Sequence, residues 1–199
     1  MTTLAAEPAA APPQQRLNIA PMGPIVDDRF ATFVLRPFKT STTYQNLKAT
    51  GAGVFHVTDD VLLIARAAVG RVVAGDAVPV RPAEAVEGLV LSGACHCYEL
   101  EVTALDDRDD RTRIEARVVA SASMRLFAGF NRARHAVLEA TILATRLFLS
   151  GADPVLAEYD RLQTIVDKTG SRREHEAMNL LRDHVEAHRR QNATTGSTP

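Results

Sequence analysis

The stretch Arg36-Pro37-Phe38-Lys39-Thr40-Ser41-Thr42-Thr43-Tyr44-Gln45-Asn46-Leu47 joins an apolar, strand-like run to a segment of helical character. Two cations and four consecutive hydroxyl residues fall within its first eight positions. The first turn of a helix leaves backbone N–H groups unpaired and favours an anion, to which cations add charge-assisted hydrogen bonds. The stretch therefore has the composition of a phosphate site. The alternative is a helix capped by Ser41 or Thr42, with surface cations nearby.

No glycine-rich loop accompanies these cations, and the Walker pattern is absent from the sequence. Gly51-Ala52-Gly53 lacks the third glycine of a dinucleotide fingerprint, and it leaves a helix to enter a strand. That is the wrong order for phosphate binding by this motif. A phosphate site here would therefore depend on the cations, the hydroxyl groups and the start of the helix.

The composition is that of an ordinary globular protein. The chain has 199 residues, of which 46% are hydrophobic and 24% charged. A net charge of −1 argues against general nucleic-acid binding, which needs a basic face. The apolar stretches are too short to span a bilayer. Two cysteines and no secretory signal indicate a reducing compartment, so we predict a cytoplasmic protein without nucleic-acid or membrane partners.

The order of predicted elements indicates an α+β fold. Apolar runs predict strands at residues 1–4, 30–35, 53–58, 89–103 and 113–123, and helices at 43–50 and 61–69. Gly51 is expected to end the first helix, and Asp59 or Asp60 to cap the second. Because strands come first and further helices come last, alternating βαβ units are not expected.

After residue 130 the apolar residues recur at helical spacing in three stripes. Asn131 is the expected cap of the first helix, and Asp153-Pro154 the expected start of the second. We therefore predict two domains and a tail. They are a sheet domain over residues 1–125, a three-helix domain over 126–190 and a disordered polar tail over 191–199.

Three clusters could suggest a metal, and each has a simpler explanation. Four aspartates between residues 106 and 110 lack the central glycine and distal glutamate of a calcium loop, so we favour a solvated hairpin turn. In Cys95-His96-Cys97 the thiols would face one side of a strand and the imidazole the other. His184 and His188 sit one helical turn apart, as pairs on charged surface helices often do. We predict no metal site.

Two further stretches bear on an anion. Asn131-Arg132-Ala133-Arg134-His135 places cations at the positive end of a helix, which the helix dipole disfavours. A nearby carboxylate or a bound anion would offset that cost. Lys168 and Thr169 end the second C-terminal helix, where they either cap it or reach an anion held by the sheet domain.

Taken together, these motifs resemble a family of uncharacterised proteins similar to the flavin-reductase-like FMN-binding split barrels. The resemblance also rests on Asn18-Ile19-Ala20-Pro21-Met22-Gly23, Val57-Thr58-Asp59-Asp60, residues 131–140 and Val166-Asp167-Lys168-Thr169-Gly170. It implies a six-stranded split β-barrel, a C-terminal helical domain, and a homodimer with FMN at the subunit boundary. Some members lie beside genes of tetrahydromethanopterin-linked one-carbon metabolism.

The resemblance also implies roles for individual residues. Arg36, Lys39, Ser41, Thr42 and Thr43 would hold the FMN phosphate, and Phe38 with the backbone near Pro21-Met22 would flank the ring system. Asn46, Lys168 and Thr169 complete the candidate cofactor-binding set. The first strand is shorter than is usual in the family. Either the start is misassigned or the edge strand is shortened, and a shortened strand would put closure of the barrel in doubt.

We therefore expect an FMN-binding flavoprotein, with an FMN-dependent oxidoreductase of unknown substrate and electron donor as the first hypothesis. The alternative is a non-catalytic protein that binds flavin or another phosphate ligand, or an assembly protein whose helices dock a partner. No residue is assigned a catalytic role. His56 and His96 would be guesses as proton donors and are left out of the candidate set.

Overall fold

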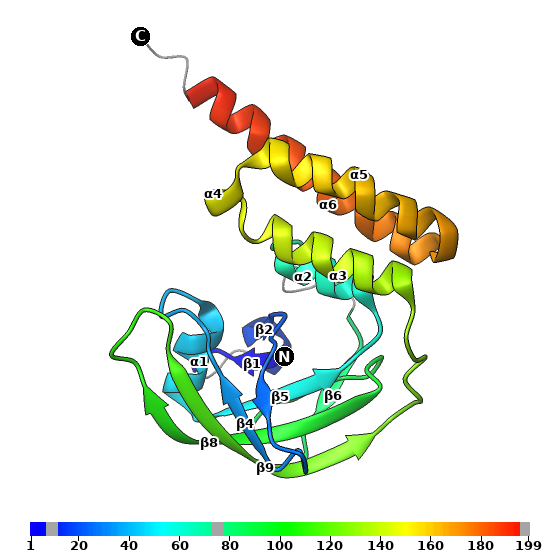
Figure 1. Cartoon of the computed structure of the whole chain (residues 1–199). Coiled ribbons are helices and arrows are strands. Elements are labelled where there is room, and N and C mark those ends of the chain that lie inside the picture. Colours follow the sequence, from blue (N-terminus) through cyan, green and yellow to red (C-terminus); the bar gives the residue numbers. More distant parts are fainter. Residues whose placement is uncertain (7–11, 73–77, 196–199) are drawn as a thin grey trace. The chain divides into compact units, whose positions relative to one another are not determined.

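The computed structural model describes residues 1–6, 12–72 and 78–195 (Figure 1). It confirms the predicted α+β class, with a mostly antiparallel sheet and C-terminal helices. The chain forms two compact units. The sheet unit comprises Met1–Thr58 and Val73–Phe127, and the helical unit comprises Asp59–Val72 and Ala128–Pro199. The second unit thus draws on two stretches of chain, and the predicted division into domains at residue 125 remains a prediction.

Seven antiparallel strands form the main sheet, in the order β2-β1-β5-β8-β9-β4-β3 (Figure 1). Their bounds are β1 Thr2–Leu4, β2 Leu17–Ile19, β3 Ile25–Val26, β4 Thr32–Leu35, β5 Ala52–Val57, β8 His96–Asp106 and β9 Arg113–Ser123. A short 3-10 helix, η1, covers Pro13–Arg16. Within the described residues β2 and β3 do not pair with each other, so the barrel is open, as in a split barrel.

The predicted strand at residues 89–103 is wrong, because a turn divides it. β7 (Leu89–Leu91) pairs with β6 (Val80–Pro82) in a separate two-stranded sheet, and β8 begins only at His96. The amide of Ala94 donates to the carbonyl of Leu91 across the Ser92-Gly93 turn, at 3.1 Å. Turn residues of this kind end a strand even where the flanking sequence is apolar.

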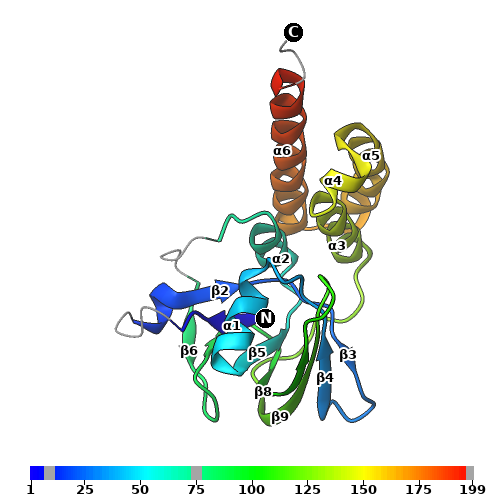
Figure 2. The same cartoon turned by 90° about the vertical axis from the view of Figure 1, so that its left-hand side faces the viewer.

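The core of the sheet unit lies between the sheet and α1 (Thr42–Thr50), which packs on β1 and β5 (Figure 2). Large apolar side chains fill it, among them Phe33, Leu35, Leu47, Leu100 and Ile114. This packing fixes the junction between the end of β4 and the start of α1, which carries the phosphate-like stretch of the sequence.

The helical unit contains five helices within the described residues. They are α2 (Val61–Ala68), α3 (Arg132–Ala144), α4 (Leu147–Ser150), α5 (Ala152–Thr169) and α6 (Arg172–Thr195). The three predicted apolar stripes lie on α3, α5 and α6 and form one core with α2. No helix in the described part of the chain is both long enough and apolar enough to cross a membrane.

Two predictions about these helices are corrected. α5 begins after Gly151, whose φ of 72° suits glycine, so Asp153 and Pro154 lie within the first turn instead of capping it. α6 continues to Thr195, so residues 191–195 are helical and not disordered. Residues 196–199 of the predicted tail lie outside the described residues.

Candidate anion-binding site

The junction of β4 and α1 is a helix start capped by a side chain. Ser41 has an extended backbone, and its Oγ accepts a hydrogen bond from the amide of Tyr44 at 3.2 Å. The amide of Ser41 donates to the carbonyl of Phe38 at 2.9 Å, which closes the turn before the helix. Ser41 is therefore the N-cap, as one of the two interpretations predicted.

This cap leaves the first helical amides available. The amides of Thr42 and Thr43 have no hydrogen-bond partner in the part of the chain that the structure describes. Helix starts characteristically leave such donors, and the helix dipole adds a partial positive charge there. The start of α1 thus offers two backbone donors and the hydroxyl of the exposed Thr42 to an anion.

The acidic run at residues 106–111 is a hairpin turn, as predicted, but it also braces the junction. The amide of Lys39 donates to the carbonyl of Asp110 at 2.9 Å, and its Nζ lies 3.3 Å from the carbonyl of Arg108. The amide and hydroxyl of Thr112 both donate to the carbonyl of Pro37, at 3.0 and 2.8 Å. The turn between β8 and β9 therefore holds residues 37–39 in place.

Two carboxylates of this turn form ion pairs. Their partners are cations other than Arg36 and Lys39. Arg108 binds Asp106 and lowers the pKa of that carboxyl to about 2. Lys48 and the hydroxyl of Tyr44 bind Asp107, at 2.7 and 2.6 Å, and lower its pKa. Arg36 is exposed and forms no ion pair among the described residues. The side chain of Lys39 donates a hydrogen bond only to a carbonyl, although its charge helps to lower the pKa of Asp106 and Asp107.

An aromatic ring lies beside these cations. The ring of Phe38 is half exposed, and the guanidinium of Arg111 sits over it, 5.3 Å from the ring centroid. The backbones of the two residues also form an isolated β-bridge. We call the group of Arg36, Phe38, Lys39, Ser41 and Thr42 the anion corner. Its features fit a phosphate with an attached planar group.

Two of the predicted contact residues point away from the anion corner. The hydroxyl of Thr43 accepts a hydrogen bond from the side-chain amide of Asn18 at 3.1 Å. The side-chain amide of Asn46 donates to the hydroxyl of Thr3 at 3.0 Å. Thr43 and Asn46 are 3% and 5% exposed, so this network lies inside the sheet unit. The backbone amide of Thr43 still belongs to the helix start, and the phosphate role of both residues remains a prediction.

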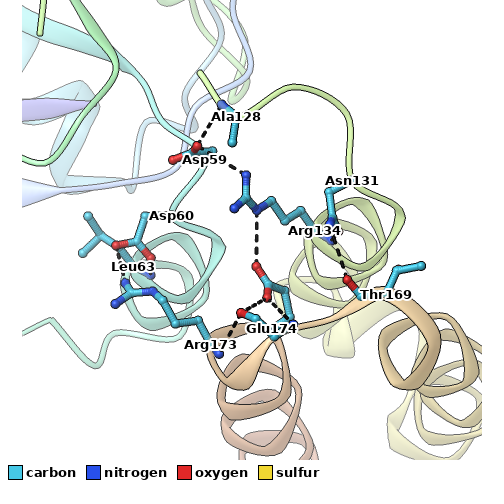
Figure 3. Close-up of polar contacts among 10 residues, drawn as sticks. Asp59, Asp60, Leu63, Ala128, Asn131, Arg134, Thr169, Arg173 and Glu174 are labelled. Atoms are coloured by element: carbon cyan, nitrogen blue, oxygen red, sulfur yellow. Dashed lines mark hydrogen bonds and ion pairs between the residues drawn. The ribbon is translucent and has the colours of Figure 1, made fainter. Parts of the chain in front are cut away.

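Lys168 and Thr169 belong to the helical unit, at the end of α5. The carbonyl of Thr169 accepts a hydrogen bond from the side chain of Asn131 at 3.4 Å (Figure 3). The hydroxyl of Thr169 donates to the carbonyl of Ile165. Lys168 is exposed and has no acidic partner within the described residues. Their role in cofactor binding remains a prediction.

Carboxylates account for one of the cations at the start of α3, Arg134. Arg134 lies 3.3 Å from both Asp59 and Glu174, whose side chains are 7% and 6% exposed (Figure 3). Burial raises the pKa of Glu174, but hydrogen bonds from Ser171 and Arg134 outweigh it, and the pKa lies below its ordinary value. The sequence allowed two explanations for a cation at this helix start, a nearby carboxylate or a bound anion. The structure shows carboxylates beside Arg134, so this residue no longer supports a bound ligand.

Sequence reasoning missed the residues that brace the anion corner. Tyr44 and Lys48 lie one turn apart on α1, which is a signal for a shared surface, but their partner Asp107 is distant in sequence. Arg111 and Thr112 fall at the end of the acidic run, which charge alone predicts to be solvated. Only the pairing of β4 with β9 brings them to Phe38 and Pro37.

Comparisons with known proteins agree with this architecture. No match was found among curated proteins. The crystal structure of an FMN-bound protein from Methanosarcina mazei, assigned to family model DUF447, has a TM-score of 0.75 and 23% identity, covering 92% of each chain. A 2-nitrobenzoate 2-nitroreductase from Pseudomonas fluorescens has a TM-score of 0.48 and 14% identity, covering 61% of each chain. An FMN-binding protein from Thermus thermophilus has a TM-score of 0.47 and 21% identity, covering 61% of this chain and 68% of its own.

The family models match most of the chain. Residues 11–125 match the N-terminal domain of a protein family of unknown function, DUF447, and residues 131–183 match its C-terminal domain. The two matches follow the order of the sheet and the C-terminal helices along the sequence. The chain therefore belongs to the DUF447 family.

Proposed function

We propose that the protein binds FMN and holds the phosphate at the anion corner, through Arg36, Lys39, Ser41 and Thr42. The observation that carries this proposal is a pair of cations that form no ion pair among the described residues, beside two unpaired amides at the start of α1. A phosphate monoester carries nearly two negative charges at neutral pH and three acceptor oxygens. The anion corner offers the complementary charge and donors.

The comparisons support the choice of FMN over other phosphate ligands. The Methanosarcina mazei protein of the same family model is FMN-bound, and it matches this chain over 92% of its length. The half-exposed ring of Phe38, with the guanidinium of Arg111 over it, would flank a planar ring next to the phosphate. Lys168 and Thr169 remain candidate contact residues in this proposal, and two protomers form a homodimer.

The most direct use of bound FMN is redox chemistry on a small molecule, which the flavin itself supplies. This chain would bind the phosphate, orient the ring and exclude water. The side chains of the anion corner, however, are guanidinium, ammonium, phenyl and hydroxyl groups, which bind an anion but do not exchange protons readily near neutral pH. That observation favours a second candidate, a flavin-binding protein without its own turnover. The one-carbon link and the cytoplasmic location remain predictions.

A double variant tests the phosphate assignment. Arg36→Ala with Lys39→Ala should weaken FMN binding about a hundredfold, because each charge-assisted contact contributes about 1.5 kcal/mol or more. FMN fluorescence quenching on titration measures the affinity. Arg29→Ala is the matched control, since Arg29 is an exposed cation of the same unit and makes no side-chain ion pair among the described residues.

Riboflavin supplies a second control, because it lacks the phosphate. The wild type and the double variant should bind riboflavin equally. Unchanged FMN affinity in the double variant would show that the phosphate lies elsewhere.

Reduction by NADH or NADPH separates the two candidate functions, an oxidoreductase and a binding protein. Bleaching of the flavin absorbance at catalytic rates indicates an oxidoreductase, and bound flavin without turnover indicates a binding protein.

A further inference from the structure

Arg111 is an exposed cation whose charge the protein itself does not pair. Its guanidinium lies over the Phe38 ring and forms no ion pair or side-chain hydrogen bond among the described residues. Asp109 and Asp110 come directly before it in the acidic turn, yet neither binds it. A guanidinium that lies over an aromatic ring keeps its N–H donors, and an anion can accept two of them at once. Arg111 is therefore accessible to an anionic ligand.

The backbone connects Arg111 to the start of α1. Arg111 and Phe38 form an isolated β-bridge, so their side chains lie on the same side of the chain pair. The hydroxyl and the amide of Ser41, the N-cap of α1, both donate to the carbonyl of Phe38, at 2.7 and 2.9 Å. A single residue, Phe38, thus lies between Arg111 and the capped helix start.

The register of the sheet places Arg36 on the same face as Arg111. β4 pairs with β9 as far as Leu35, and the bridge at Phe38 continues that register (Figure 1). Leu35 is buried whereas Arg36 and Phe38 are exposed, as expected where side chains of an extended chain alternate between faces. Arg36 and Arg111 are therefore diagonal neighbours on the exposed face. Such neighbours lie about 7–8 Å apart, within the reach of long side chains.

A third arginine on this face shows how the fold neutralises a cation. Arg113 lies two residues from Arg111, and its guanidinium binds the carboxylate of Glu115 at 3.0 Å. Like charges on neighbouring strands repel each other, so such a partner is favourable. Arg36 and Arg111 form no ion pair among the described residues. Their two positive charges match the nearly two negative charges of a phosphate monoester at neutral pH.

We propose that Arg111 binds the ligand phosphate as a further cation of the anion corner, and that Phe38 is the positioning residue for its guanidinium. The cation–π contact with Phe38 restricts the guanidinium before the ligand arrives, so less conformational entropy is lost on binding. This inference rests on the proposed function, because it adds two roles to the same phosphate site. The positioning role of Phe38 is separable from its role beside a planar ring.

The ratio of FMN affinity to riboflavin affinity isolates the phosphate, because riboflavin lacks only that group. Arg111→Gln should lower this ratio about tenfold, the effect of one charge-assisted contact, and leave riboflavin affinity unchanged. Arg111→Lys keeps the charge but lacks the planar fork, so it should restore the ratio only in part. Flavin fluorescence quenching on titration measures both affinities.

Arg113→Gln is the matched control. It removes one positive charge from the same face, at a guanidinium that Glu115 already binds, so the ratio should change by less than about twofold. Equal losses in Arg113→Gln and Arg111→Gln would mean that the general electrostatic field attracts the phosphate. That result would overturn the direct contact assigned to Arg111.

A double-mutant cycle tests the role of Phe38. Phe38→Leu keeps an apolar side chain but removes the aromatic face, so it should lower the ratio about threefold. In the Arg111→Gln background the same change should leave the ratio unaltered, because no guanidinium remains to be held. Phe38→Tyr keeps the aromatic face and should retain the wild-type ratio. If Phe38→Leu lowered the affinities for FMN and riboflavin equally, Phe38 would contact the flavin ring alone, and its positioning role would be overturned.

Inorganic phosphate separates a failure of this inference from a failure of the proposed function. Its binding is measured by isothermal titration calorimetry. If Arg36→Ala with Lys39→Ala weakens FMN binding and Arg111→Gln does not, the inference is overturned and the proposed function stands. If the protein binds FMN no better than riboflavin, but Arg111→Gln weakens the binding of inorganic phosphate, the proposed function is overturned and the anion contact of Arg111 stands. Absence of binding of both FMN and phosphate would overturn both.

Discussion

Two helices of this protein, α1 and α3, have cations at or before their first turn. The two sets of cations differ in whether carboxylates of the protein pair with them. Arg36 and Lys39 precede α1, and neither forms an ion pair with a carboxylate in the described chain. Arg134 lies in the first turn of α3, where Asp59 and Glu174 both bind it. A helix dipole disfavours cations at the start of its helix. Arg134 is therefore explained by the protein itself, whereas Arg36 and Lys39 are not.

The difference lies in residues distant in sequence. Asp59 is 75 residues from Arg134, and Glu174 is 40 residues from it. The carboxylates paired with Arg134 are mostly buried, so loss of this cation would leave buried charge uncompensated, whereas loss of the exposed Arg36 would affect stability little. Cations at a helix start thus indicate a ligand only where no carboxylate of the fold reaches them.

Replacement of Arg134 should give the largest effect on stability. Arg134→Met leaves the carboxylates of Asp59 and Glu174 buried without their cation, which we expect to lower the free energy of unfolding by about 3 kcal/mol. Urea denaturation followed by far-UV circular dichroism measures this change. Arg132→Ala is the matched control, because this exposed neighbour has no partner in the described residues and should change stability by less than about 0.5 kcal/mol.

A combined variant tests the cause of that loss. Adding Asp59→Asn and Glu174→Gln to Arg134→Met removes the two unpaired charges and should restore part of the stability. Equal stability of Arg134→Met and the wild type would mean that the ion pairs do not stabilise the helical unit. The contrast with α1 would then fail.

Acid should affect the two regions in different pH ranges. The pKa of Glu174 is lower in the folded protein than in the unfolded chain, so the unfolded chain binds more protons as the pH falls. The resulting stabilisation is complete above the ordinary carboxyl pKa and is lost as the pH falls through the folded value. Glu174→Gln should therefore flatten the loss of stability below about pH 4.5.

FMN affinity should respond at higher pH. The second ionisation of a phosphate monoester lies near pH 6, so binding at the anion corner should weaken between about pH 7 and pH 5. Stability measured in urea should change little over that range. If both quantities fell together, a shared titrating group would be indicated, and the two regions would not be independent.

The sequence predicted the local features of both regions. Ser41, Gly51 and Asn131 end or begin helices as expected, because caps depend on neighbouring residues. The apolar stripes of the C-terminal helices are buried as their spacing indicated. The α+β order of elements followed from the same periodicity.

Long-range contacts were not predictable from local patterns. The turn that divides residues 89–103 depends on β7 pairing with β6 and not with the main sheet. The inward direction of Thr43 and Asn46 depends on Thr3 and Asn18. A helical projection gave a signal for these two, because both share the buried face of α1 with Leu47. For Arg134 the sequence indicated a nearby carboxylate or anion, but it gave no signal that Asp59 and Glu174 are the partners.

The smallest expected effect concerns Lys168, whose position has an explanation without a ligand. It is an exposed cation in the last turn of α5, where the helix dipole favours it. If it also approaches the FMN phosphate, Lys168→Ala should weaken FMN binding by about threefold, which is typical of one solvated charge. Arg172→Ala is the matched control, because Arg172 is an exposed cation in the first turn of α6.

The comparison of Lys168→Ala with Lys39→Ala then decides how far the ligand site extends. If Lys168→Ala and Arg172→Ala weaken FMN binding equally, the loss of one positive charge accounts for the effect. Phosphate binding would then be confined to the sheet unit. A loss as large as that of Lys39→Ala would show that α5 supplies a direct contact. In that case a cation favoured by its own helix would also serve the ligand, and the absence of a carboxylate partner would no longer suffice to tell the two regions apart.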